Sequence, residues 1–326
     1  MLDFRPVLFA IGVLMCILAA FMMIPAIADL SQANPDWRGF VRAAALTLLI
    51  GGGLALMTRS DKPGLNIRQA FVMIVLAWAT LPAMAALPFL FADPAMGYAA
   101  AYFEAMSGLT TTGASVLATP EAMPPGILLW RSLLQGLGGI GILVMAIALF
   151  PMLRVGGMQL FRMEFSDRME KGLPRATQVA SGIIMIYVGL IIVCALLYWF
   201  GGMSLFDAAN HAMATVATGG FSTRNNSFAA FDSALIEMTA VLFMILGALP
   251  FLLYLRAATR NWRPLLTDSQ VRAFLLFLVG VVVLMVLYLM LVRGAPPGEA
   301  LRHGTFNIVS ILTGTGFSST DYQLWG

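Results

Sequence analysis

The segment Ala-Thr-Gly-Gly-Phe-Ser at residues 217–222 lies between very apolar stretches, and two related segments occur elsewhere in the chain. They are Thr-Thr-Thr-Gly-Ala-Ser at 110–115 and Leu-Thr-Gly-Thr-Gly-Phe-Ser at 312–318. The glycines on which the copies align are Gly113, Gly220 and Gly316. Backbone polar groups at membrane depth are costly unless they face a cavity, where carbonyl oxygens can replace the water around a cation. The repeated segments therefore indicate an ion pathway.

The composition predicts an all-α integral membrane protein. Of the 326 residues, 60% are hydrophobic and 11% are charged, whereas a soluble domain has about 25% charged residues. A helix needs about 20 apolar residues to cross a bilayer, and seven stretches qualify. They are residues 7–28, 40–58, 69–92, 132–153, 176–206, 238–255 and 273–292. The first is too long for the apolar region of a cleaved signal peptide, so we expect it to remain as a span.

Basic residues predict the orientation of these spans, because three alternate loops hold 12 of the 19 Lys and Arg residues. They are Arg59, Lys62 and Arg68; Arg154, Arg162, Arg168, Lys171 and Arg175; and Arg256, Arg260, Arg263 and Arg272. Positively charged loops stay on the cytoplasmic side. This places the N-terminus inside and all three Thr/Gly segments outside. The net charge of +3 is thus a topology signal, and no nucleic-acid partner is expected.

The order of the segments predicts a repeated unit of span, short helix, Thr/Gly strand and span. The short segments 96–109, 203–216 and 298–312 cannot cross a bilayer and suit re-entrant half-helices, which gives three pore loops. A leading pair of spans precedes the repeats. The predicted divisions are 1–68 (leading pair), 69–178 (repeat 1, strand 110–115), 179–271 (repeat 2, strand 217–222) and 272–326 (incomplete repeat 3, strand 313–318).

The chemistry of this unit suits a hard cation. A half-helix entering from outside directs its partly negative C-terminal end to the membrane centre, and the strand after it offers the oxygen ligands that hard cations prefer. Glycine permits the backbone angles that turn adjacent carbonyls to one side. The predicted ligands are Thr110, Thr111, Thr112, Gly113, Ala217, Thr218, Gly219, Gly220, Thr313, Gly314, Thr315 and Gly316. Ordinary Gly/Thr helix contacts would explain one such segment, but three copies in one topological position favour an ion filter.

Polar residues stand nine positions before each aligned glycine, and we predict that they support the filter from behind. They are Glu104, His211 and Asn307. Two alternatives remain open, since Glu104 could instead attract cations to the outer vestibule, and His211 could be a pH-sensitive element instead of a neutral structural histidine. Arg131, at the outer start of a span, is expected to snorkel toward the surface and pair with a local carboxylate. Its alternative role is electrostatic tuning of the outer mouth.

Together these motifs resemble the membrane subunits of the Trk/Ktr/HKT superfamily of potassium transporters, most closely the bacterial Trk type. The resemblance covers essentially the whole chain. The matching text is Ser-Gly-Leu-Thr-Thr-Thr-Gly-Ala at 107–114, Ala-Thr-Gly-Gly-Phe-Ser-Thr at 217–223, Thr-Gly-Thr-Gly-Phe-Ser at 313–318, and Trp-Arg-Ser-Leu-Leu-Gln at 130–135 running into Gly-Gly-Ile-Gly at 138–141.

The resemblance implies a gated potassium pore in a bacterial inner membrane, built from four repeats whose strand carbonyls coordinate K⁺. It also implies a homodimer and a cytosolic, nucleotide-binding regulatory subunit of the RCK type, for which the basic loop 155–177 is a candidate docking segment. In relatives, serine in place of the first filter glycine goes with sodium transport, so Gly113 favours potassium. Because each strand has a single aligned glycine, we expect modest K⁺ over Na⁺ discrimination, with Rb⁺ accepted.

The sequence departs from the family at its end. Gly326 follows Gly316 by ten residues, so the next span and a fourth repeat are absent, and we expect a truncated chain or a pore completed by another polypeptide. The competing hypotheses are a non-conducting fragment and a cation-coupled symporter. Symport is disfavoured because carriers usually place ionisable residues in mid-span. No acid–base pair, nucleophile–histidine spacing or metal cluster suggests an enzyme or a cofactor other than transported K⁺.

Overall fold

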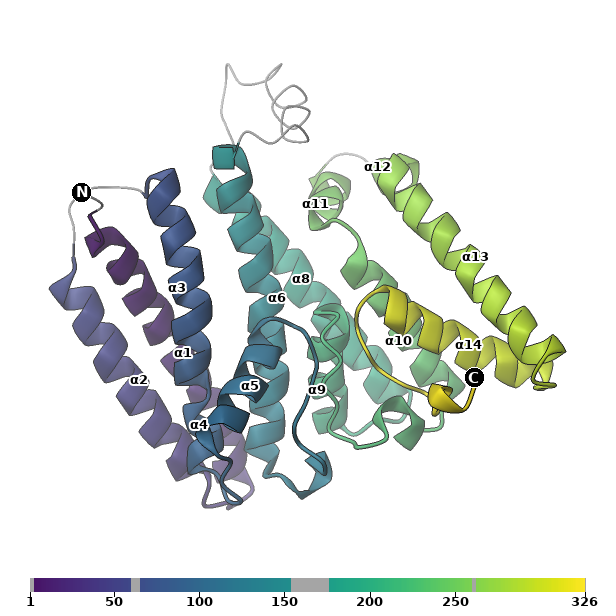
Figure 1. Cartoon of the computed structure of the whole chain (residues 1–326), viewed down its shortest axis with the longest axis horizontal. Coiled ribbons are helices and arrows are strands. Elements are labelled where there is room, and N and C mark those ends of the chain that lie inside the picture. The colour runs from purple at the N-terminus through teal and green to yellow at the C-terminus, as the bar shows by residue number, and fades with distance from the viewer. Residues whose placement is uncertain (1–2, 60–64, 154–175, 260–261, 326) are drawn as a thin grey trace.

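A computed structural model describes residues 3–59, 65–153, 176–259 and 262–325 of the chain. Within these ranges the structure is built from helices and connecting turns and contains no β-strand. The all-α prediction is therefore confirmed for the described part. Figure 1 shows the helices side by side, with the N-terminal pair at one edge and α13 and α14 at the other.

The leading pair consists of α1 (Arg5–Ser31) and α2 (Trp37–Met57), which pack against each other (Figure 1). Their backbones meet at two glycines. A Cβ atom on Gly12 would lie 2.6 Å from the Gly51 carbonyl oxygen, and one on Gly51 would lie 2.6 Å from the Met15 Cβ. Such contacts are typical of helices held together in a membrane by close backbone approach.

The rest of the described chain repeats a pattern of long and short helices. Repeat 1 contains α3 (Ile67–Ala85), α4 (Leu87–Phe91), α5 (Tyr98–Leu109) and α6 (Pro125–Leu153). Repeat 2 contains α8 (Ala176–Phe200), α9 (Leu205–Val216), α10 (Ala234–Ala248) and α11 (Phe251–Thr259). After α12 (Pro264–Thr267) come α13 (Ser269–Leu291) and α14 (Pro297–Leu312). Short 3₁₀ turns occupy Pro120–Ala122, Ser227–Ala230 and Tyr322–Trp325.

Five helices of the described part are long and apolar enough to cross a membrane. They are Arg5–Ser31, Trp37–Met57, Ile67–Phe91, Gln178–Phe200 and Ser269–Leu291. The predicted span 238–255 is broken in the structure, because α10 and the helix that follows are bent by 92° at Leu249 and Pro250, and the pair is either one bent span or a re-entrant loop. Proline lacks the N–H that continues a helix and favours an extended residue before it, and Leu249 has ψ 151°. The predicted span 132–153 lies in α6, whose side chains from 142 onward fall outside the description.

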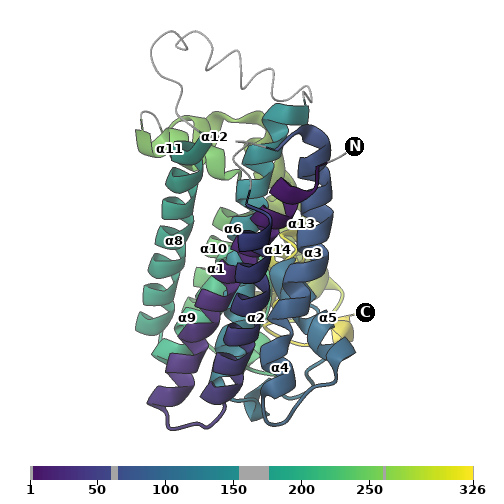
Figure 2. The ribbon, with the colours of Figure 1, turned by 90° about the vertical axis from the view of Figure 1, so that its left-hand side faces the viewer.

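The two ends of the bundle differ in character. The N-terminus, the start of α3, α11 and α12 lie at one end, whereas α4, α5 and the lower half of α9 lie toward the other, as both views show (Figures 1 and 2). The basic residues Arg5, Arg68 and Arg256 belong to the first end. The predicted orientation places this end in the cytoplasm and stays a prediction. The candidate docking loop 155–177 lies almost entirely outside the described residues.

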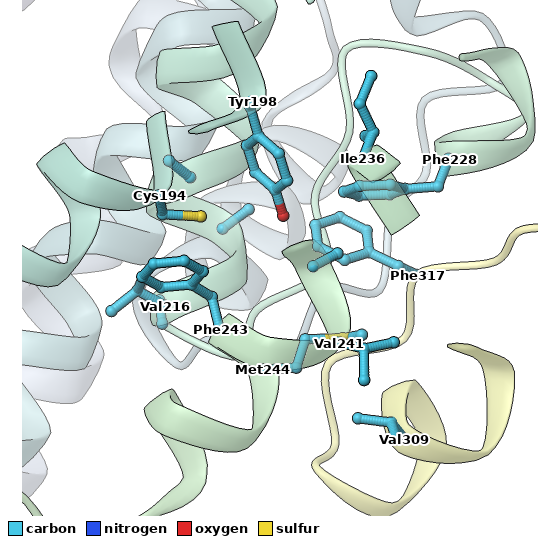
Figure 3. Packing of buried hydrophobic residues seen from close by; sticks show 14 of the residues in the cluster. Cys194, Tyr198, Val216, Phe228, Ile236, Val241, Phe243, Met244, Val309 and Phe317 are labelled. Carbon is cyan, nitrogen blue, oxygen red and sulfur yellow. The ribbon is translucent and has the colours of Figure 1, made fainter. Parts of the chain in front are cut away.

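Two buried clusters hold the repeats together. One joins α1, α2, α5 and α6, where Trp130 is fully buried and donates its indole N–H to the Ala85 carbonyl at 2.9 Å. The other joins α8, α9, α10 and α14, and Figure 3 shows Tyr198, Phe228 and Phe317 within it. Phe228 and Phe317 have ring centroids 4.6 Å apart. The second cluster thus ties the loop after one Thr/Gly strand to the next strand.

We expect Gly51→Leu to destabilise the leading pair, because the new side chain has to enter space already filled by α1. The expected loss is about 1–3 kcal/mol of folding free energy, as for overpacked cores. It can be measured as a lower thermal unfolding midpoint of the detergent-purified protein. Gly53→Leu is the matched control, since a Cβ there meets no atom within 4 Å. Equal unfolding midpoints for the two variants would contradict the close approach of α1 and α2 at Gly51.

Candidate functional site

Each Thr/Gly segment starts as the end of a short helix. In every copy the N–H of the residue before the aligned glycine donates to a carbonyl five residues back. These bonds run from Thr112 to Ser107 (2.9 Å), from Gly219 to Ala214 (2.8 Å) and from Thr315 to Ser310 (2.9 Å). A second bond, such as Thr111 N–H to the Gly108 carbonyl at 3.0 Å, completes the Schellman turn that closes a helix. The three helices α5, α9 and α14 therefore end in the same way.

The backbone after each helix has positive φ at two aligned positions. The aligned glycines have φ of 77° (Gly113), 79° (Gly220) and 85° (Gly316). Two residues earlier the values are 55° (Thr111), 49° (Thr218) and 76° (Gly314). β-Branched residues rarely adopt positive φ, so the two threonines are strained, and such strain clusters at functional sites. In a regular strand successive carbonyls point in alternating directions. The positive φ angles interrupt this alternation, so that neighbouring carbonyls can point to the same side.

The three Thr/Gly segments 110–115, 217–222 and 313–318 are called strands here, although they form no β-sheet. They contact one another in chain order. A Cβ atom on Gly113 would overlap the carbonyl oxygen of Gly219 in the second strand, and one on Gly220 would overlap the carbonyl oxygen of Thr315 in the third. Gly113 and Gly220 are therefore required by a neighbouring backbone as well as by their own φ. For Gly316, no atom of the described residues lies within 4 Å of such a Cβ. The structure thus brings all three predicted strands together and leaves this side of the third strand uncovered.

Glu104 lies behind the first strand and is fully buried. Its carboxylate accepts hydrogen bonds from the Ser115 hydroxyl (2.9 Å), the Val116 N–H (3.0 Å) and the guanidinium of Arg131 (2.7 Å). The side chain is enclosed and hydrogen-bonded on both oxygens, which favours a supporting role over an outer vestibule charge. Arg131 pairs with a carboxylate as expected, but the snorkelling expectation is wrong, since its 2% exposure places it in the interior.

His211 lies behind the second strand, where its ring is fully buried and stands edge-on to Phe228 and Phe231. Its Nδ1 bonds to the Asp207 carbonyl at 2.8 Å and therefore carries a proton, because a carbonyl can only accept. Its Nε2 faces the Ser222 hydroxyl at 2.9 Å. The neutral ring is satisfied on both nitrogens, which favours the structural histidine over the pH-sensitive one.

Asn307 lies behind the third strand and is also fully buried. Its amide nitrogen donates to the His303 carbonyl (2.9 Å) and the Ser319 hydroxyl (3.0 Å), while its oxygen accepts from the Ser319 N–H at 3.3 Å. Each of the three aligned residues therefore contacts the chain two or three residues beyond an aligned glycine. This geometry agrees with a supporting role, which itself stays a prediction.

α6 makes two contacts with this region, and sequence reasoning missed the one made by Gln135. Gln135 is fully buried, and its amide donates to the Gly219 carbonyl and accepts from the Phe221 N–H at 3.1 Å. Gly138 lets α6 approach the end of α5, because a Cβ there would overlap the Leu109 carbonyl. Gln135 was visible only as part of a family motif, and its partner lies 84 residues away.

The geometry of the site is accompanied by close likeness to known proteins. The family model described as "TrkH: Cation transport protein" matches residues 38–326. The Trk system potassium uptake protein TrkI of Halomonas elongata is 39% identical over 98% of this chain and 65% of its own length. For Escherichia coli TrkH the identity is 35%, over 99% of this chain and 68% of that protein. The crystal structure of the potassium transporter TrkH from Vibrio parahaemolyticus superimposes with a TM-score of 0.91 at 33% identity, covering 100% of this chain and 68% of that one.

This chain therefore spans about two thirds of the length of the curated relatives that it matches. The family consists of transport proteins and not of enzymes, in agreement with the prediction from sequence. The match extends over most of the chain, and the relatives exceed 30% identity along nearly all of it. The chain belongs to the TrkH family of cation transport proteins.

Proposed function

We propose that this chain forms the wall of a potassium-uptake pore in a bacterial inner membrane, with its N-terminus in the cytoplasm. The observation that carries the proposal is the shared conformation of three adjacent strands, each with positive φ at the same two positions. Such backbone at membrane depth is tolerated where it lines a water-filled path. The names of the relatives TrkI and TrkH, which are potassium uptake proteins, agree with this cargo.

The ion ligands in this proposal are backbone oxygens of the three strands. Carbonyls of residues 110–113, 217–220 and 313–316 would replace the hydration shell of K⁺. The Gly219 carbonyl is an exception, because it is held by Gln135, and we assign it to fixing the strand. Retention of Gly113 favours K⁺ over Na⁺, and Rb⁺, which resembles K⁺, would also pass.

A three-sided cage does not surround a cation, and the uncovered side of Gly316 marks where a further wall belongs. The first two contacts between strands place a carbonyl against an aligned glycine, and a fourth strand presenting a carbonyl to Gly316 would extend that rule. Whether that strand belongs to the same polypeptide or to a partner is decided by testing the full-length protein. A homodimer and an RCK-type nucleotide-binding regulatory subunit remain part of the proposal by resemblance alone.

Replacing Gly220 tests the pore directly. We expect Gly220→Ala in the full-length protein to reduce Rb⁺ uptake by about tenfold or more, because strain of about 1–3 kcal/mol adds to overlap with the Thr315 carbonyl. Uptake is measured in a bacterium that lacks other K⁺ uptake systems. Gly202→Ala is the control, since Gly202 also has positive φ (108°) but no neighbour within 4 Å of its Cβ position. Normal uptake by the Gly220 variant would rule out the filter.

The buried pair of Glu104 and Arg131 gives a second prediction. Arg131→Met should destabilise the protein by about 3–5 kcal/mol, because it leaves a buried carboxylate without its cation. Adding Glu104→Gln should recover part of this loss, which a double-mutant cycle on thermal unfolding can measure. The exposed pair of Arg302 and Asp232 is the control, since Asp232 is 88% exposed and Asp232→Ala should cost less than about 1 kcal/mol. Strict additivity of the two buried substitutions would contradict coupling between Glu104 and Arg131.

A further inference from the structure

One face of α6 contacts the Thr/Gly strand of the following repeat. Arg131 and Gln135 are four residues apart and so lie on the same side of the helix. Arg131 donates to the Ser222 carbonyl at 3.0 Å, and its guanidinium lies 4.1 Å from the centre of the Phe221 ring. Gln135 binds the same strand at the Gly219 carbonyl. The second strand is thus held along its length by a helix that belongs to the first repeat.

Gln135 holds the two peptide groups on either side of Gly220. Its amide nitrogen holds the Gly219 carbonyl, and its amide oxygen holds the Phe221 N–H. Two opposed bonds to one strand prevent that strand from rotating about its axis. The fit also requires glycine at 219, because a Cβ there would overlap the Gln135 amide. The same carbonyl is the one that fills the space beside Gly113.

The next repeat has no such contact, and an internal landmark makes the comparison possible. Gly138 of α6 packs on the Leu109 carbonyl, and Gly247 of α10 packs on the Val216 carbonyl. Both carbonyls stand four residues before an aligned glycine, so the two helix glycines correspond. Counting back from Gly247, the residues equivalent to Gln135 and Arg131 are Met244 and Ala240. Neither side chain can donate a hydrogen bond to the third strand.

We propose that Gln135 sets the cation selectivity of the pore by fixing the Gly219 carbonyl against Gly113. The first and second strands then form a half of the filter that α6 fixes, whereas the third strand is held by Ser310, Ser227 and Phe228 and not by α10. A stiff spacing disfavours Na⁺, because its smaller radius requires the strands to move inward. Gln135 is a positioning residue, since its amide touches the strand and not the ion. This inference rests on the proposed function and adds the residue that sets the cation selectivity of the pore.

Three variants of the full-length protein separate selectivity from folding. Gln135→Met keeps the length of the side chain and removes both hydrogen bonds. Gln135→Glu keeps the acceptor for Phe221 N–H and places a carboxylate oxygen against the Gly219 carbonyl. Gln69→Met is the matched control, because Gln69 is a buried glutamine that bonds the Asp3 carbonyl at the opposite end of the molecule. Membrane levels are measured for each by immunoblotting.

The readout is a ratio of two concentrations. It is the Na⁺ concentration that halves Rb⁺ uptake divided by the K⁺ concentration that does so, and a high ratio means a preference for K⁺. Losing the hold on the Gly219 carbonyl should lower the K⁺ preference by about fivefold in Gln135→Met, which also loses the bond from the Phe221 N–H. The loss should be at least as large in Gln135→Glu, because its carboxylate repels that carbonyl. Gln69→Met should keep the wild-type ratio. A purely structural role would change maximal uptake and leave the ratio unaltered, so the ratio distinguishes positioning from stability.

The outcomes separate this inference from the proposed function. If the wild-type protein takes up no Rb⁺, the proposed function fails and the inference falls with it. If the wild-type protein takes up Rb⁺ and both Gln135 variants keep its ratio, the inference alone is overturned. Failure of both variants to reach wild-type membrane levels would also overturn it, by showing that Gln135 serves folding. A lowered ratio at normal membrane level supports it.

Discussion

A carbonyl or N–H group within a membrane has to find a partner inside the protein, and this requirement governs the structure around the three strands. Three short helices, α5, α9 and α14, end where the Thr/Gly strands begin, and their last carbonyls have no helical partner. Schellman turns satisfy some of them, and the bonds to Ser107, Ala214 and Ser310 are the same in every copy. Helix glycines then pack directly on the helix ends, Gly138 on α5 and Gly247 on α9. The repeats are similar because in each of them the same backbone turn pairs the unpaired carbonyls at the end of a short helix.

The polar side chains behind the three strands differ in kind from one repeat to the next. Glu104, His211 and Asn307 differ in charge and size, yet each bonds to the chain two or three residues after an aligned glycine. The first of them carries a charge and therefore needs Arg131 as a buried counter-ion. The other two are neutral and use hydroxyl or carbonyl partners. What is constant is the segment that is held, two or three residues after an aligned glycine, and the residue that holds it differs between the copies.

The sequence predicted those features that depend on local pattern, and it missed those that depend on contacts between repeats. Apolar length identified α1, α2 and α13, and alignment on three glycines located the strands and the polar residue behind each. Local pattern did not reveal that Gln135 reaches the second strand, because nothing near residue 135 encodes how two repeats pack. The break at Pro250 was missed for a different reason, since apolar length alone was allowed to outweigh a proline inside the predicted span.

The two positive-φ positions of each strand carry different demands, which explains why only one of them is always glycine. The earlier position holds Thr111, Thr218 and Gly314, and there the backbone angle is the only constraint, so threonine is tolerated at the expense of strain. The later position combines positive φ with a neighbouring carbonyl where a Cβ would lie, at Gly113 and at Gly220. No L side chain meets both demands. Gly316 has the same angle but no described atom within 4 Å of its Cβ position, so in the described structure its φ alone accounts for glycine there.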